Sequence, residues 1–332
     1  MATGRDLRAL PKAHLHVHLE GSMRPTTVVE LAHRHGVELP EGLREGRYEF
    51  RDFRHFIAEW VAGLRSLQRL EDFRRIAYEF CEDEAREGVR YAEVSFSLPE
   101  HAARSGDWDG SVLAVLDGFA DGERDHGIVC RPYVDVVRGV GMALSRMAME
   151  SAVRHRDGGV IGIGLGGDER HPPEAYAHLF RHATEEGLHS LPHAGETGGP
   201  ASIAGALHAL AAERLGHGIH VLEDPMLVAE VRERRIPLDV CPTSNVMTKV
   251  VPSAAAHPLP RLLEEGLVVT LKADDPSMFA TSITDEFGFA RDLVGLSDEE
   301  LADISRTAIR VSFAPQELKD GFCGDVDAWL TG

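Results

Sequence analysis

The chain has 332 residues, of which 43% are hydrophobic and 27% charged. This composition is typical of a globular protein and excludes an intrinsically disordered chain. A formal net charge of −19 repels nucleic-acid backbones, so we expect no nucleic-acid partner, although the acidic excess also suits a merely solvated surface. No apolar run approaches the roughly 18 residues of a membrane span, and the first ten residues lack the apolar core of a secretory signal. We therefore expect a cytoplasmic protein without a membrane partner.

Short runs rich in Val, Ile and Leu alternate along the chain with longer segments of helical periodicity. The runs predict eight strands, at 13–19, 89–97, 128–137, 160–165, 188–193, 214–220, 236–241 and 267–273. The intervening segments predict helices, for example at 111–125, 173–186, 200–213 and 225–234. Prolines at or near the starts of several of these helices suit a first helical turn.

Eight strands, each followed by a helix, predict an α/β protein with the closed (β/α)8 TIM-barrel fold rather than an open sheet. The first crossover is unusually long. It predicts a helical insertion at about 22–88, with helices at 25–35, 52–67 and 70–87, and the tail 297–330 predicts extra C-terminal helices. We find no linker, low-complexity segment or repeat, so we expect residues 1–332 to form one domain. In such barrels the active site lies at the C-terminal ends of the strands.

The first predicted strand ends in two histidines, His16 and His18. Side chains alternate along a strand, so both imidazoles share one face and point into the barrel if Leu15 and Val17 pack outward. Neutral imidazole is a good zinc ligand. Alone, this pattern is equally compatible with two buried, hydrogen-bonded histidines.

Three further strand ends carry residues able to bind a metal or transfer a proton. Strand five ends at His193 with Glu196 in the following loop, strand six carries His217, and strand eight ends with Asp274 and Asp275. Adjacent carboxylates repel each other unless a cation or ligand compensates, although Asp-Asp-Pro alone is also a common turn or helix cap. The convergence of four strand ends on one rim predicts a metal-dependent hydrolase.

Six motifs, in this order, resemble the adenosine deaminase family: Pro11–Gly21, Gly164–Glu169, His193–Glu196, Leu215–Gly218, Cys241–Asn245 and Asp274–Pro276. The resemblance implies one Zn²⁺ per chain and a small purine nucleoside as substrate. It also implies residue roles: His16, His18, His193 and Asp274 as zinc ligands, Glu196 as the acid that protonates purine N1, His217 as the group that orients and deprotonates the attacking water, Asp275 paired with N7, Gly167 with N3, and Glu20 near the ribose 5′ end.

Two positions depart from the family pattern. Lys272 stands where the family usually has asparagine, and Ser95 stands where an arginine is common. A buried ammonium at position 272 is costly unless paired, so Lys272 either has a carboxylate partner or marks an altered site. Ser95 indicates a changed substrate rim or has no effect.

The family resemblance leaves the substrate open. The motifs favour adenosine or a 5′-modified adenosine as the substrate. The second choice is 6-aminodeoxyfutalosine, which is a menaquinone precursor, and the third is free adenine. The segment 187–197 together with Cys241–Asn245 also resembles 6-aminodeoxyfutalosine deaminases, but those tend to depart from the His-Leu-Glu-Gly that this chain keeps at 18–21. The sequence does not specify an oligomeric state.

Three other classes of protein fit less well. A cytidine-type zinc deaminase needs Pro-Cys-x-x-Cys, which the four widely spaced cysteines do not supply. A two-metal hydrolase would need a lysine at the end of strand four, which instead ends in Gly164–Gly167. A non-catalytic nucleoside-binding protein would need a lost ligand or acid, and every such position is filled.

Overall fold

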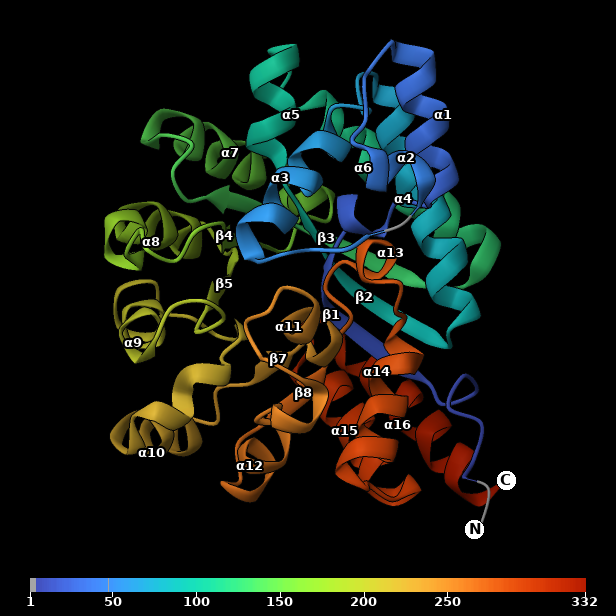
Figure 1. Ribbon diagram of the computed structural model, residues 1–332, viewed down its shortest axis with the longest axis vertical. Coiled ribbons are helices and arrows are strands. Elements are labelled where there is room, and N and C mark those ends of the chain that lie inside the picture. Colours follow the sequence, from blue (N-terminus) through green and yellow to red (C-terminus); the bar gives the residue numbers. More distant parts are fainter. Residues whose placement is uncertain (1–3, 47) are drawn as a thin grey trace.

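Eight parallel strands follow one another around a barrel in the computed structural model of the protein (Figure 1). The structure describes residues 4–46 and 48–332, so the predicted domain range 1–332 includes four residues, 1–3 and 47, that lie outside it. The strands are β1 Lys12–His18, β2 Val89–Phe96, β3 Val129–Val137, β4 Gly162–Gly166, β5 His189–Ala194, β6 Leu215–His217, β7 Leu238–Val240 and β8 Val269–Leu271.

The barrel closes between its first and last strands just beyond the end of β8. Val17 pairs in parallel with Asp274, and the backbone N–H of His18 donates to the carbonyl of Asp274 at 2.8 Å. Each other strand pairs with its sequence neighbour. This order confirms the predicted (β/α)8 barrel.

Helices surround the barrel (Figure 1). The α-helices after β2 are α5 Leu98–Ser105, α6 Gly110–His126, α7 Met142–Arg154, α8 Ala177–Glu185, α9 Pro200–Ala209, α10 Pro225–Glu233, α11 Pro242–Met247, α12 Leu259–Glu264, α13 Pro276–Phe279, α14 Ile283–Phe289, α15 Asp298–Val311 and α16 Gln316–Thr331. Shorter helical turns are η1 Glu20–Ser22, η2 Arg156–Gly158, η3 Pro173–Tyr176, η4 Ile219–Glu223, η5 Ala254–Ala256 and the π-helix η6 Ala290–Val294. The predicted C-terminal helices are α15 and α16. Among the described residues, no helix is long and apolar enough to cross a bilayer.

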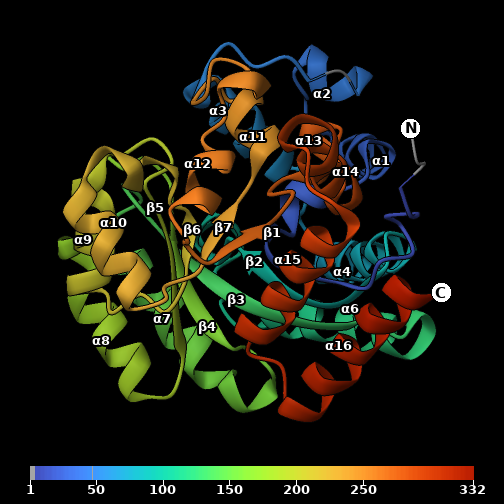
Figure 2. The same ribbon diagram turned by 90° about the horizontal axis from the view of Figure 1, so that it is seen from below.

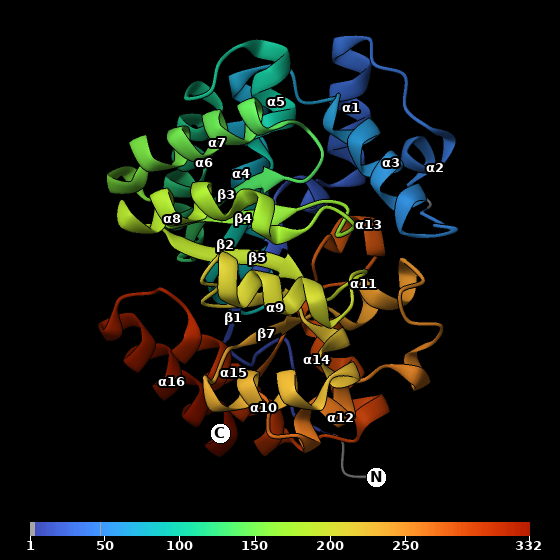
Figure 3. The same ribbon diagram turned by 90° about the vertical axis from the view of Figure 1, so that its left-hand side faces the viewer.

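The described residues of the predicted insertion after β1 form the helices α1 Pro25–His35, α2 Glu41–Glu45, α3 Phe53–Leu64 and α4 Leu70–Arg86. Two perpendicular views place α3 with α11 and α13 at one end of the barrel (Figures 2 and 3). Because α11 and α13 follow the C-terminal ends of β7 and β8, this end is the rim where active sites form in such barrels.

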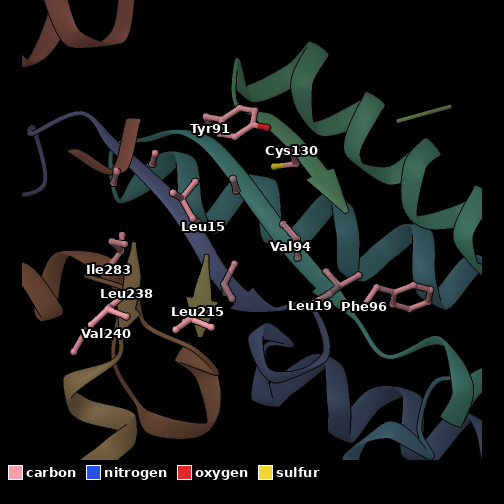
Figure 4. Close-up of a cluster of buried hydrophobic side chains, with 14 of the residues drawn as sticks. Leu15, Leu19, Tyr91, Val94, Phe96, Cys130, Leu215, Leu238, Val240 and Ile283 are labelled. Carbon is pink, nitrogen blue, oxygen red and sulfur yellow. The ribbon is translucent and has the colours of Figure 1, made fainter. Parts of the chain in front are cut away.

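The core lies between the strands and the helices. Figure 4 shows Leu15 and Leu19 from the first strand segment beside Val94 and Phe96 of β2, and all four are buried. Val17 is also fully buried in this cluster, so the apolar residues that alternate with the two histidines of β1 do pack into the core.

The last three strands are shorter than predicted, with three residues each. The apolar runs continue past their ends, but the backbone turns into the left-handed region at His217 (φ 62°) and at Asp274 (φ 64°). Non-glycine residues rarely adopt this conformation, which is frequent at functional sites.

Candidate active site

Four side chains from three parts of the barrel meet at its C-terminal rim. His16 and His18 come from β1, His193 from β5, and Asp274 follows β8, and their candidate ligand atoms all lie within 4.8 Å of one another. The Nε2 atoms of His18 and His193 are 3.1 Å apart. The Asp274 Oδ1 atom lies 3.3 Å from His18 Nε2 and 3.5 Å from His16 Nε2.

This cluster fits a divalent metal ion. The Nε2 atom of His16 is buried and has no hydrogen-bond partner, whereas buried polar atoms are normally paired. Three imidazole nitrogens with one carboxylate are ligands that zinc accepts. A second set replaces His18 and His193 with His217 and Cys241. Burial, reinforced by nearby carboxylates, raises the pKa of the Cys241 thiol, which disfavours the thiolate that a metal would need.

Asp274 is fixed by its neighbours as well as by the histidines. The Ser244 hydroxyl donates to Asp274 Oδ2 at 2.6 Å, leaving Oδ1 to face the imidazoles. The next residue, Asp275, lies against Gly21, where an added Cβ would be 1.7 Å from Asp275 Oδ1. The glycine after Glu20 is therefore required by the close approach of this carboxylate.

Glu196 lies in the loop after β5 and is buried. The carboxylate of Glu169 accepts hydrogen bonds from the backbone N–H groups of residues 195–197 at 2.7 to 2.9 Å, which holds this loop in place. Burial, reinforced by the negative charges of Asp274, Glu169 and Asp275, raises the pKa of Glu196 well above its usual range. This shift favours the protonated form of Glu196, which can act as an acid.

His217 faces both Glu196 and Asp274, with its Nε2 atom 3.7 Å and 3.8 Å from their carboxylates. Burial lowers its pKa to about 4, so the ring is neutral. Its Nδ1 atom is 3.2 Å from the side-chain amide nitrogen of Asn245. Because that amide nitrogen can only donate, the ring proton of His217 is on Nε2, toward the metal cluster.

Two further contacts fix the orientation of the Asn245 amide. The backbone N–H of Leu259 donates to His257 Nδ1 at 3.1 Å, so the proton of neutral His257 is on Nε2. His257 Nε2 lies 3.2 Å from Asn245 Oδ1 and donates to it. This leaves the amide nitrogen of Asn245 to face His217.

A pocket opens beside the metal cluster and encloses about 660 Å³, including its mouth. Its apolar wall comes largely from helix α3 of the insertion, and Trp60 Nε1 of that helix donates to Asp275 Oδ1 at 2.9 Å. Burial raises the pKa of Asp275, which favours the protonated form of this carboxyl. Gly167, Glu196 and His217 also line the pocket, and no lysine or arginine is present among its described lining residues.

Glu20 lies behind the pocket wall rather than in it. Its Oε1 atom accepts from the backbone N–H of Ser97 and faces His101 Nε2, each at 2.9 Å. Lys272 lies deeper in the barrel, where its ammonium donates to the carbonyl of Ala13 at 2.8 Å across the seam between β8 and β1. Burial lowers its pKa to about 8, although Asp239 opposes this.

Several residues of the site were not predicted from the sequence. Glu169, Ser244 and Asn245 lie within motifs that resemble the family. Their positions could therefore be singled out from the sequence, but their contacts could not. Trp60 and Asp135 lie outside those motifs, yet both line the pocket.

Comparison with known proteins supports the interpretation of this geometry. Residues 11–329 match the adenosine deaminase family. A putative adenosine/adenine deaminase of Streptomyces coelicolor is 39% identical over 98% of both chains, and an aminodeoxyfutalosine deaminase of the same organism is 38% identical over 98% of this chain and 88% of that protein. The crystal structure of an adenine deaminase from Arthrobacter aurescens has a TM-score of 0.89 and 34% identity, covering 97% of this chain and 100% of that one. A Burkholderia ambifaria amidohydrolase with bound zinc has a TM-score of 0.90 and 27% identity, covering 98% and 93%.

Proposed function

The chain belongs to the adenosine deaminase family, and from this premise we propose that it is a zinc-dependent hydrolase that removes the 6-amino group of adenosine or a 5′-modified adenosine. Family membership makes it an aminohydrolase, which excludes the non-catalytic binding protein. The products would be ammonia and the inosine-type nucleoside. The observation that carries the proposal is the buried carboxyl group of Glu196, which lines the pocket beside the metal cluster and lies 3.7 Å from His217 Nε2. The cytoplasmic location stays a prediction.

The carboxyl groups of the pocket are suited to a purine ring. C6 of adenine is a poor electrophile, and donation of the Glu196 proton to N1 makes it electron-deficient. The protonated Asp275 would donate to N7 with its orientation fixed by Trp60, and the backbone N–H of Gly167 would donate to N3. These three contacts hold the ring in register with the metal cluster.

His16, His18, His193 and Asp274 are the residues that would hold zinc. A zinc ion lowers the pKa of a coordinated water from about 15.7 to about 7, which supplies hydroxide at neutral pH. His217 would orient the attacking water as a donor through Nε2. The resemblance also implies that His217 deprotonates this water, and Nε2 could accept that proton only in the other tautomer of the ring.

The charge of the pocket favours a substrate without an anionic group. Asp135, with its pKa raised by burial only to about 6, is ionised at neutral pH and lines the pocket, whereas no lysine or arginine is present among the described lining residues. The carboxylate of 6-aminodeoxyfutalosine would meet this charge without a lysine or arginine to pair with. Deamination of that compound and of adenine remain the alternatives, because relatives bear those names.

A rate screen of ammonia release tests this proposal. We expect adenosine and uncharged 5′-substituted adenosines to show kcat/KM values at least about tenfold above those of adenine and 6-aminodeoxyfutalosine, a difference of about 1.4 kcal/mol in transition-state binding. Chelated enzyme is the control and should regain activity with zinc. A highest rate on adenine or on 6-aminodeoxyfutalosine would contradict the proposed substrate.

A further inference from the structure

The carboxylate of Asp135 faces the pocket without a full set of hydrogen-bond partners. Asp135 lies in β3 near its C-terminal end, is 3% exposed and lines the pocket. Its Oδ2 atom accepts from the Ser95 hydroxyl at 2.5 Å, whereas its buried Oδ1 atom has no partner. An unpaired buried carboxylate oxygen is costly, which points to a ligand that supplies a donor.

The neighbouring strand leaves room for this carboxylate. A Cβ added at Gly164 of β4 would lie 2.0 Å from Asp135 Oδ1, so only glycine permits this placement of Asp135. Ser95, which departs from the arginine common in the family, supplies the hydroxyl that orients Asp135. Residues from β2, β3 and β4 together therefore build this part of the wall.

A second unpaired atom lies beside Asp135. The Nδ1 atom of His18 is buried and has no hydrogen-bond partner, and it lies 3.9 Å from Asp135 Oδ2, beyond hydrogen-bond range. The Nε2 atom of His18 faces His193 and Asp274, and with Nε2 as a metal ligand the ring proton would be on Nδ1. The ring nitrogen that would donate and the Asp135 carboxylate, whose Oδ2 can accept a second hydrogen bond, thus lie close together without a hydrogen bond between them.

We propose that Asp135 accepts a hydrogen bond from a hydroxyl group on the sugar of the substrate. A hydroxyl can accept from His18 Nδ1 while it donates to Asp135, whereas a phosphate or carboxylate would be repelled by Asp135 and by Glu100, which also lines the pocket. This inference rests on the proposed function and makes Asp135 the residue that separates hydroxylated nucleosides from the free base.

Binding of two ligands that lack the amino group and are not deaminated tests the proposal. Purine riboside carries the sugar hydroxyls and purine does not. In the zinc-loaded Asp135→Ala variant, calorimetry should show purine riboside affinity falling 10- to 100-fold, the range for a lost hydrogen bond to a charged group, and purine affinity unchanged within twofold. Asp157→Ala, at an exposed position paired with Arg156, is the matched control and should change neither affinity.

Three results would overturn the proposal: an unchanged affinity for purine riboside, equal losses for both ligands, or a parent enzyme that binds purine riboside no tighter than purine. Equal losses with lowered zinc content would assign Asp135 to the support of His18 instead. If Asp135→Ala does not fold, Asp135→Asn is subjected to the same comparison. Ammonia release from adenosine by the parent is measured in the same series. If the parent releases no ammonia, the proposed function is contradicted. If the parent deaminates adenosine but the variant binds purine riboside as tightly as the parent does, only this inference is contradicted.

Discussion

Glu196 must hold a proton at neutral pH in order to donate it to a purine nitrogen. The Glu196→Gln variant keeps the size of the side chain but has no acidic proton, and it leaves the four metal ligands in place. We expect kcat to fall by about 10² to 10⁴, the contribution typical of general acid catalysis, with an unchanged zinc content. Ammonia release and metal analysis on the same preparation measure both quantities, and a rate near that of the parent would remove Glu196 as the acid.

Asp274 contributes the oxygen ligand, and Ser244 holds that carboxylate in orientation. Asp274→Ala should weaken zinc retention severely, because it removes one of four ligands. Ser244→Ala should weaken it by only about 10- to 100-fold, as expected for a residue that supports a ligand. Competition with a chromophoric chelator gives both dissociation constants. If Asp274→Ala retained zinc as tightly as the parent, the ligand assignment would be wrong.

Helix α14 carries a buried acid outside the active site. Glu286 accepts from the backbone N–H of Thr243 at 3.1 Å and from the Thr281 hydroxyl at 2.7 Å. Burial raises its pKa from 4.5 to about 7 despite these bonds. Between these two values the folded protein binds a proton that the unfolded chain releases, so the free energy of unfolding falls as the pH rises through this window.

The Glu286→Gln variant removes this titration. The parent should therefore lose up to about 3 kcal/mol of stability relative to the variant between about pH 4.5 and pH 8, because one pKa unit corresponds to about 1.4 kcal/mol. Urea unfolding of both proteins across this range measures the difference, in which the titration of the other groups cancels. A difference independent of pH would show that Glu286 titrates normally.

The regular elements were largely predictable because their periodicity is local. The predicted helix 25–35 matches α1, and the predicted strand 13–19 lies within one residue of β1. The predicted helix 173–186 is instead divided into η3 and α8. Strand β6 ends early because the backbone turns at the site residue His217, and the sequence run carries no signal for such a turn.

The contacts between distant segments were less predictable. The four metal ligands followed from strand-end geometry and family motifs. Trp60 is 215 residues from Asp275, and no spacing indicates that an insertion helix returns to that carboxylate. The sequence left open whether Lys272 has a carboxylate partner or marks an altered site; its hydrogen bond goes to the backbone carbonyl of Ala13, and Asp239 is the carboxylate whose charge favours its ammonium form. Such contacts depend on tertiary packing rather than on local pattern.

The insertion and the barrel share the active-site pocket, and we propose that the whole chain unfolds as one domain. Trp60 of α3 reports on the insertion when Trp108 and Trp329 are replaced by phenylalanine, while circular dichroism reports on the whole chain. We expect coincident thermal transitions, shifted to lower temperature by chelation because zinc binds the folded state. An earlier transition of Trp60 would show that the insertion is a separate unit.

The metal centre supports the entire account, and crystals of the zinc-loaded protein test it most directly. Anomalous diffraction at the zinc edge should give one peak per chain, about 2.0–2.2 Å from nitrogens of His16, His18 and His193 and from an oxygen of Asp274. A peak bound instead by His217 and Cys241, or the absence of a peak at this rim, would contradict the assignment of the metal ligands and the chemistry built on it.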